Sequence, residues 1–306
     1  MGHPGKIGVL LLAHGSPDEI SEIPEFLLRV TGGRPLPEES IEEIKQRYAA
    51  IGRSPLTALT NKQAELLSRE LRLPVYVGMR NWKPFISDAV RSMTTDGIGL
   101  AVVICMAPQN SRTSVGLFRS TLALSNPPFE FEFVESWHDH PLLIKAFAQR
   151  LRVGLEAARR ETKVDMPVIF TAHSVPQRTI AEGDPYETQA KQTATLVAGA
   201  VPVSGERCTF AFQSQGVAGG PWIGPNVEDT ILTLAAKGER NIFIQPIGFL
   251  CDHVEILYDI DIAFKSFAGK QGIKLWRAES LNGSPLLAAA LADIVRNRLV
   301  PFGVRV

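Results

Sequence analysis

The sequence predicts an α/β protein with two similar domains in tandem, each a parallel sheet covered by helices on both faces. Short unbroken apolar runs alternate with amphipathic helical segments along all 306 residues, as in sheets buried on both sides. A faint internal repeat supports two domains: LLLAHGSP ends at Pro17 and IFTAHSVP ends at Pro176. Each is an apolar strand, Ala-His and a turn. Coincidence is the alternative, because strand–turn–proline sequences are common.

The first half contains four apolar runs of strand length and three segments with helical spacing. Residues 40–50, for example, place Ile41, Ile44 and Tyr48 along one side, which is the spacing of a helix face. The strands are predicted at 9–12, 75–77, 100–105 and 131–135, and the helices at 40–50, 61–73 and 84–93. We assign residues 1–140 to the first domain.

The second half repeats the alternation, and residues 141–282 form the second predicted domain. Its strands are short apolar runs, and its helices are longer segments with apolar residues three or four apart. The strands are predicted at 168–170, 208–212 and 242–245, and the helices at 142–158, 189–201, 226–236 and 285–299.

Composition argues against several classes of protein. The formal net charge is +0, from 32 basic and 32 acidic residues, so no strong field attracts nucleic acid or an anionic membrane. The three cysteines are far apart and include no CxxC, which disfavours a disulfide framework or structural zinc and suits a reducing cytoplasm. Residues 7–13 resemble a first strand rather than a signal peptide, and no apolar stretch has the length of a transmembrane helix.

The segment GFLCDHVEILYDID (248–261) carries the most distinctive acidic pattern. If a helix begins near Cys251, then Asp252, Glu255 and Asp259 lie at i, i+3 and i+7 on one face. A solvated acidic face is the alternative reading. The surrounding residues are apolar on all sides, and burying a carboxylate among them costs free energy unless it is paired with a cation or takes part in catalysis or binding. We therefore favour a functional role for this stripe.

Two histidines follow predicted strands, His14 and His173. Ligands of open α/β sheets bind beyond the carboxyl ends of the strands, so both histidines would line a cleft between the domains. His173 could be a general base, and with Glu255 or Asp259 it could hold a transferable metal. A backbone-bonded turn histidine is the alternative for both. His138 and His140 are expected to be ordinary loop histidines.

The usual hydrolase and nucleotide motifs are missing. No GxSxG elbow is present, and Ser214 in FQSQG lacks the preceding glycine. The patterns GxGxxG and GxxxxGK[ST] are also absent, which argues against nucleotide chemistry.

Several motifs together resemble those of ferrochelatases, specifically the short soluble bacterial kind. They are LLLAHGSP, YVGMRNWKPFI, VESWHDHP, TAHSVP with GDPY, and the HVEILYDID segment, and they extend nearly end to end. The resemblance implies two Rossmann-like domains with a porphyrin cleft between them, the C-terminal helix (283–306) packing back on the first domain. It also implies ferrous iron and a porphyrin as substrates in haem synthesis.

The resemblance assigns roles to individual residues. The family's catalytic histidine corresponds to His173 and its glutamate to Glu255, with Asp259 one turn further on. We expect neutral His173 to accept pyrrole protons and, with Glu255, to contact Fe²⁺. His14 corresponds to a tyrosine that faces the other side of the ring and is a further candidate metal ligand. The residues expected to hold propionates or line the cleft are Arg47, Tyr48, Ser54 and, more weakly, Arg34.

The chain departs from the family pattern at several positions. His14 replaces the tyrosine, Asn81 replaces a frequent histidine, Gln215 replaces an acidic residue, and Ala263 interrupts an acidic chain. With three cysteines and none after Cys251, an iron–sulfur cluster of four thiolates is not expected. We expect no tightly bound cofactor and a monomer.

The sequence leaves more than one substrate possible. The short length and the missing hydrophobic lip favour coproporphyrin III over protoporphyrin IX. The alternatives are a cobalt or nickel chelatase acting on another tetrapyrrole, and a non-enzymatic tetrapyrrole carrier. A carrier needs no base–carboxylate pair, so His173 and Glu255 argue against it.

Overall fold

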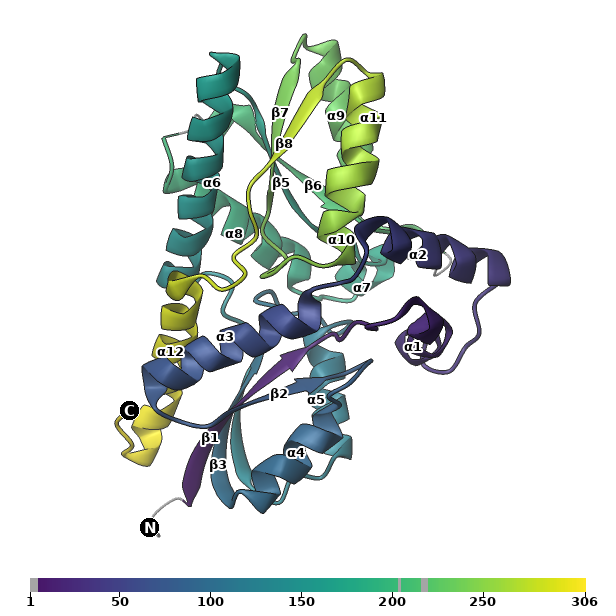
Figure 1. Cartoon of the computed structure of the whole chain (residues 1–306). Coiled ribbons are helices and arrows are strands. Elements are labelled where there is room, and N and C mark those ends of the chain that lie inside the picture. The colour runs from purple at the N-terminus through teal and green to yellow at the C-terminus, as the bar shows by residue number, and fades with distance from the viewer. Residues whose placement is uncertain (1–4, 203–204, 216–219) are drawn as a thin grey trace.

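The computed structural model describes residues 5–202, 205–215 and 220–306, which form two four-stranded parallel sheets (Figure 1). The first sheet has the order β2-β1-β3-β4 and the second β6-β5-β7-β8, so the strand order is the same in both halves. The predicted fold class is confirmed. The strands are β1 (Lys6–Ala13), β2 (Val75–Met79), β3 (Ile98–Cys105), β4 (Glu130–Val134), β5 (Val168–His173), β6 (Cys208–Gln213), β7 (Asn241–Pro246) and β8 (Lys274–Arg277).

The central strand β1 shows why the apolar runs are unbroken. It pairs in parallel with β2 on one side and β3 on the other. Leu11 packs in the cluster that contains Leu67, and Leu10 and Leu12 pack on the opposite face. Because both faces of the strand are covered, alternation with polar residues is absent.

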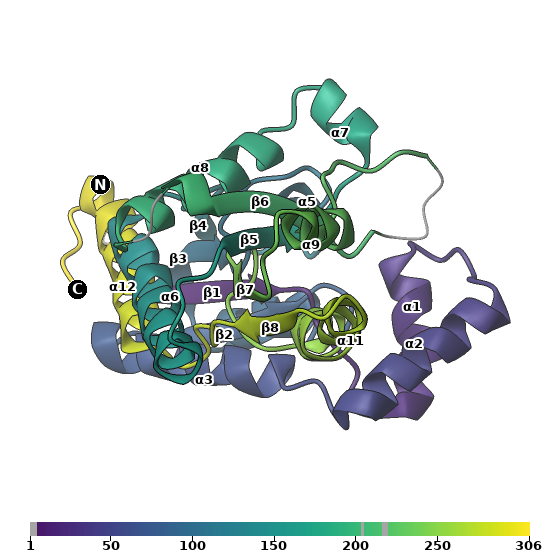
Figure 2. The same cartoon turned by 90° about the horizontal axis from the view of Figure 1, so that it is seen from above.

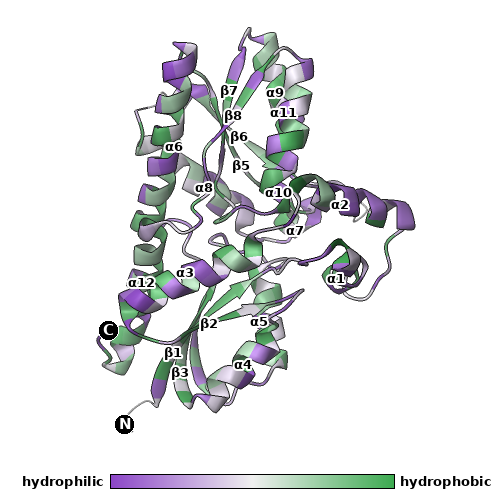
Figure 3. Ribbon diagram, in the orientation of Figure 1, coloured by the Kyte–Doolittle hydropathy of each residue, from purple (hydrophilic) through white to green (hydrophobic). Residues whose placement is uncertain are grey.

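Helices surround both sheets, as Figure 2 shows from above. Hydrophobic residues concentrate in the strands and on the inner sides of the helices (Figure 3). No helix of the described residues is long and apolar enough to cross a bilayer. The helices are α1 (Ile23–Val30), α2 (Glu38–Ile51), α3 (Leu56–Leu71), α4 (Ile86–Thr95), α5 (Val115–Leu124), α6 (Pro141–Thr162), α7 (Gln177–Ala181), α8 (Tyr186–Gly199), α9 (Val227–Ala236), α10 (Val254–Leu257), α11 (Lys265–Lys270) and α12 (Pro285–Leu299).

The sequence missed the short or atypical elements. Helices α1 and α5 and the four-residue strand β8 were not predicted, and residues 259–264 form a π-helix between α10 and α11. Strand β8 (KLWR) has charged residues at both ends, which hides the strand pattern. The predicted helix at 285–299 matches α12.

Helix α12 follows the second sheet in sequence but packs against α3 and α6 (Figure 1). Leu287, Leu291 and Val295 lie in the same buried cluster as Leu67 of α3. Helices α1 and α2 instead project to one side (Figure 2), where Phe26, Tyr48 and Trp82 form a small separate core.

Candidate functional site

His173 is the last residue of β5, at the carboxyl end of the second sheet. Its Nδ1 donates to the carbonyl of Ser174, so Nε2 faces Glu255, whose Oε1 lies 3.2 Å away. The Tyr186 hydroxyl donates to the His173 carbonyl at 2.9 Å. One hydrogen bond at the ring and one at the backbone carbonyl of His173 therefore fix the orientation of the imidazole.

Glu255 contacts a second imidazole, which the sequence reasoning missed. His253 Nε2 lies 3.3 Å from Glu255 Oε2, so one carboxylate lies between two histidines. His253 is the extended N-cap residue of α10, and Glu255 lies two residues further on, in the first turn of that helix. The pattern HxE in the motif was the available signal.

The pKa values of the pair are shifted in opposite directions. Burial acts to lower the pKa of His173, but the charge and hydrogen bond of Glu255 outweigh it and raise that pKa to about 9. Burial acts to raise the pKa of Glu255, but His173 and His253 hold it well below its usual range. The carboxylate of Glu255 thus favours the imidazolium form of His173 in the unliganded protein, and a neutral His173 during turnover stays a prediction.

Asp259 lies next to this pair and connects the two halves. The Ser214 hydroxyl donates to its Oδ2 at 2.5 Å, and Arg47 Nη1 of α2 lies 3.6 Å from its Oδ1. Burial raises the pKa of Asp259, so its carboxylate accepts a proton more readily than an exposed aspartate.

The predicted stripe of three carboxylates is wrong at Asp252. Helix α10 begins at Val254 after the extended residue His253, so Asp252 lies outside the helix. Its carboxylate accepts from Ser280 Oγ at 2.7 Å and Asn282 Nδ2 at 2.8 Å. The i, i+3, i+7 rule needs one continuous α-helix, and this segment changes from extended to α to π.

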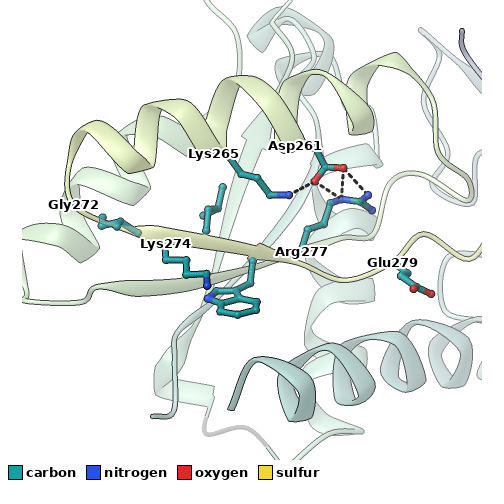
Figure 4. Close-up of a pocket in the computed structure, with 9 residues that line it drawn as sticks. Asp261, Lys265, Gly272, Lys274, Arg277 and Glu279 are labelled. Atoms are coloured by element: carbon teal, nitrogen blue, oxygen red, sulfur yellow. Dashed lines mark hydrogen bonds and ion pairs between the residues drawn. The ribbon is translucent and has the colours of Figure 1, made fainter. Parts of the chain in front are cut away.

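An open groove of about 850 Å³ is lined by β8 and by the segment that runs from the π-helix into α11 (Figure 4). Arg277 and Lys265 both pair with Asp261, at 2.7 and 2.8 Å, and Lys274 pairs with Glu161. Every cation lining the groove thus has an acidic partner. Asp261 ties the π-helix to β8 and does not extend the acidic chain from Asp259.

His14 occupies the corresponding place at the end of β1. Its Nδ1 donates to the carbonyl of Gly15 at 3.0 Å, the same local geometry as in His173. His14 is exposed on this edge, and the protein packed around it, together with the charge of Arg80, lowers its pKa to about 4. Glu255 and His253 also act on this pKa, so the two histidine-bearing sheet edges face one another.

The remaining predicted residues differ in their access to this region. Tyr48 is 6% exposed, and its hydroxyl is 3.1 Å from Ser16 Oγ. Ser54 Oγ is buried with no partner in the described part of the chain. Arg34 lies on the exposed loop between α1 and α2, where its side chain bonds Thr31. Only Arg47 directly contacts the acidic site residues.

Comparison with known proteins agrees with this arrangement. The family model described as Ferrochelatase matches residues 6–299. The chain belongs to the ferrochelatase family. It is an enzyme of haem synthesis whose family inserts iron into porphyrin, and the resemblance stated from its motifs is confirmed.

Curated ferrochelatases match over nearly the whole chain. The "Ferrochelatase" of Acidobacterium capsulatum is 53% identical, covering 96% of this chain and 95% of the relative. The "Coproporphyrin III ferrochelatase" of Geobacillus sp. is 34% identical, covering 96% and 98%. Among solved structures, SirB from Bacillus subtilis with Fe³⁺ is 14% identical with a TM-score of 0.59, covering 96% of this chain and 95% of that chain, a likeness that supports the fold alone.

Proposed function

We propose that this ferrochelatase inserts ferrous iron into coproporphyrin III, in preference to protoporphyrin IX, and releases two protons. The observation that carries the proposal is Glu255 placed between His173 and His253. A free porphyrin holds two pyrrole protons, and two imidazoles that share one carboxylate provide two acceptors with a common counter-charge. The names of several relatives support coproporphyrin.

His173 must lose its resting proton before it can accept one from a pyrrole. An approaching divalent cation and an apolar macrocycle both disfavour the imidazolium form, so substrate binding lowers the pKa of His173. Asp259 is the adjacent carboxylate with a raised pKa, and it is our candidate to relay that proton outward. Glu255 stays ionised and offsets the positive charge.

The opposite wall supplies binding and metal approach. Arg47 and Ser54 offer donors to substrate carboxylates, and this remote binding energy can be used to bend the ring. His14 lacks a carboxylate partner among the described residues, and its low pKa of about 4 leaves Nε2 unprotonated. We therefore assign proton removal to the His173 side and Fe²⁺ approach to the His14 side.

In the deciding assay, purified protein is mixed anaerobically with ferrous iron and either coproporphyrin III or protoporphyrin IX. The rate of metal insertion is measured from the change in porphyrin absorbance. We expect His173→Ala to abolish insertion while the porphyrin still binds, and Glu255→Gln to slow turnover by at least about 100-fold. Normal turnover of His173→Ala would refute the assignment. Faster loading of cobalt or nickel into a more carboxylated tetrapyrrole would favour the rival chelatase.

We also place the enzyme in the cytoplasm as a monomer without a resident cofactor. Cys105, Cys208 and Cys251 are free thiols, which suits a reducing compartment. Size-exclusion chromatography with light scattering and metal analysis of the purified protein test the last two points.

A further inference from the structure

We propose that Arg80 binds a peripheral carboxylate that coproporphyrin III has and protoporphyrin IX lacks, and so selects between the two porphyrins. The inference rests on the proposed function, because it concerns the same substrate. It assigns a specificity role to a residue outside the predicted propionate contacts.

Arg80 lies where ligands of this fold bind. Strand β2 ends at Met79, and the Arg80 amide donates to the Ala13 carbonyl at 3.0 Å. The next amide, of Asn81, donates to the His14 carbonyl at 3.0 Å. Arg80 thus directly follows the strand that neighbours β1 and lies beside His14, at the carboxyl edge of the first sheet.

The guanidinium is half-buried and has no acidic partner among residues 5–202, 205–215 and 220–306. Its Nε is buried without a hydrogen bond, and its one ring contact is Phe118, 5.9 Å from the guanidinium carbon. Other arginines near the junction are paired, such as Arg47 with Glu43 at 2.6 Å and Arg277 with Asp261 at 2.7 Å. A half-buried, unpaired cation is unfavourable unless a ligand supplies the counter-charge.

The chemistry of the position selects an anion. A guanidinium only donates hydrogen bonds and repels a metal cation until an anion neutralises its charge, while a carboxylate only accepts and can bind it through two parallel bonds. The neighbouring Asn81 replaces a histidine that could ligate metal, and its buried Nδ2 also lacks a partner in the described region. The local donor excess therefore fits a carboxylate rather than iron.

The separation of Arg80 from the other donors points to the additional carboxylates. Arg47 is on α2 and Ser54 precedes α3, whereas Arg80 follows β2 and lies beside His14. A porphyrin with carboxylates on one side only can satisfy one of these groups. Coproporphyrin III carries four carboxylates around its rim and can reach both.

The test uses the full chain and measures porphyrin binding without iron. Arg80→Met removes the charge with little change in volume. We expect its dissociation constant for coproporphyrin III, from fluorescence quenching, to rise about tenfold, with that for protoporphyrin IX unchanged within about twofold. Arg80→Lys should retain part of the preference. The matched control is Arg119→Met, since Arg119 is exposed and already paired with Glu135.

The outcomes separate this inference from the proposed function. Equal weakening for both porphyrins, or none for either, would overturn the assignment of Arg80, even if the wild-type enzyme inserts iron into coproporphyrin III. Failure of the wild-type enzyme to bind or metallate coproporphyrin III would overturn both. Arg80→Gln with a wild-type melting temperature provides the same comparison if Arg80→Met unfolds.

Discussion

At the scale of the residue, the function of Glu255 depends on the groups that share its charge. A carboxylate with one imidazole can stabilise one imidazolium, and with two it can stabilise protons from both pyrrole nitrogens in turn. His253 also packs against Phe249, with ring centroids 4.6 Å apart, which limits its orientations. Its Nδ1 has no hydrogen-bond partner among the described residues, unlike that of His173, so ring packing and the contact with Glu255 position this histidine.

We expect His253→Gln to lower kcat by about 100-fold with little change in KM for porphyrin, because a general acid or base contributes about 10²–10⁴-fold to the rate. Steady-state kinetics with saturating Fe²⁺ measure both constants. The control is His140→Gln, since His140 pairs with Asp293 at 3.1 Å away from Glu255. Wild-type kcat in the His253 variant would exclude it from proton transfer.

His14 and His173 should change the free energy of unfolding with pH in opposite directions and in different pH ranges. The pKa of His173 is raised to about 9, so its stabilisation is complete below its ordinary pKa of 6.5 and is lost as pH rises toward 9. The pKa of His14 is lowered to about 4, so it opposes folding at acidic pH and this penalty disappears as pH rises from 4 to 6.5.

Urea unfolding at several pH values checks both limbs. His173→Gln should flatten the slope of the unfolding free energy between pH 6.5 and 9, and His14→Gln should flatten it between pH 4 and 6.5. Unchanged slopes in both variants would show that these residues titrate as they do in an unfolded chain.

At the scale of the element, the loop before α10 is held by one residue from the far end of the second half. Asn282 donates to Asp252 Oδ2 at 2.8 Å, accepts from the Asp252 amide at 2.9 Å, and its carbonyl accepts from Gln63 of α3 at 3.0 Å. Its φ of 47° is left-handed, a conformation that asparagine tolerates. The loop that carries His253 is thereby tied to the first half.

Asn282→Ala should destabilise the protein by about 2–3 kcal/mol, from two lost hydrogen bonds and a strained backbone, and should also lower kcat. Thermal unfolding and turnover are the measurements. Asn126→Ala is the control for backbone strain alone, because Asn126 has a similar φ of 45°. If both variants behave alike, the bonds to Asp252 contribute nothing beyond the left-handed turn.

At the scale of the whole molecule, α12 joins parts of the chain that are far apart in sequence. It covers α3 in the first half and also contacts α6, while Arg47 and Asp259 join the halves at the site. The carboxyl edges of the two sheets are therefore held in a fixed relation by α12 and by the contact between Arg47 and Asp259.

Leu291→Ala should lower the unfolding free energy by about 2–5 kcal/mol, because Leu291 is fully buried and its loss leaves a cavity. Urea denaturation measures the change. Val300→Ala, at a position that is 66% exposed, should change stability by less than about 0.5 kcal/mol. A similar small effect at Leu291 would mean that α12 contributes little to joining the halves.

The sequence by itself determined the fold class, the repeat and the family. Unbroken apolar runs indicate strands that are buried on both faces, and the two Ala-His turns indicate two domains of the same topology. The HVEILYDID motif indicates which residues carry the chemistry. These features are local, so spacing along the chain is enough to recognise them.

Only the tertiary structure decided how those residues meet. It placed His253 against Glu255, turned Asp252 toward Asn282, raised the pKa of His173 and left Arg80 without an acidic partner among the described residues. Such outcomes depend on contacts between segments that are distant in sequence and on a helix that changes from α to π geometry. Periodicity assumes one regular helix and says nothing of partners across a fold, so it could not supply them.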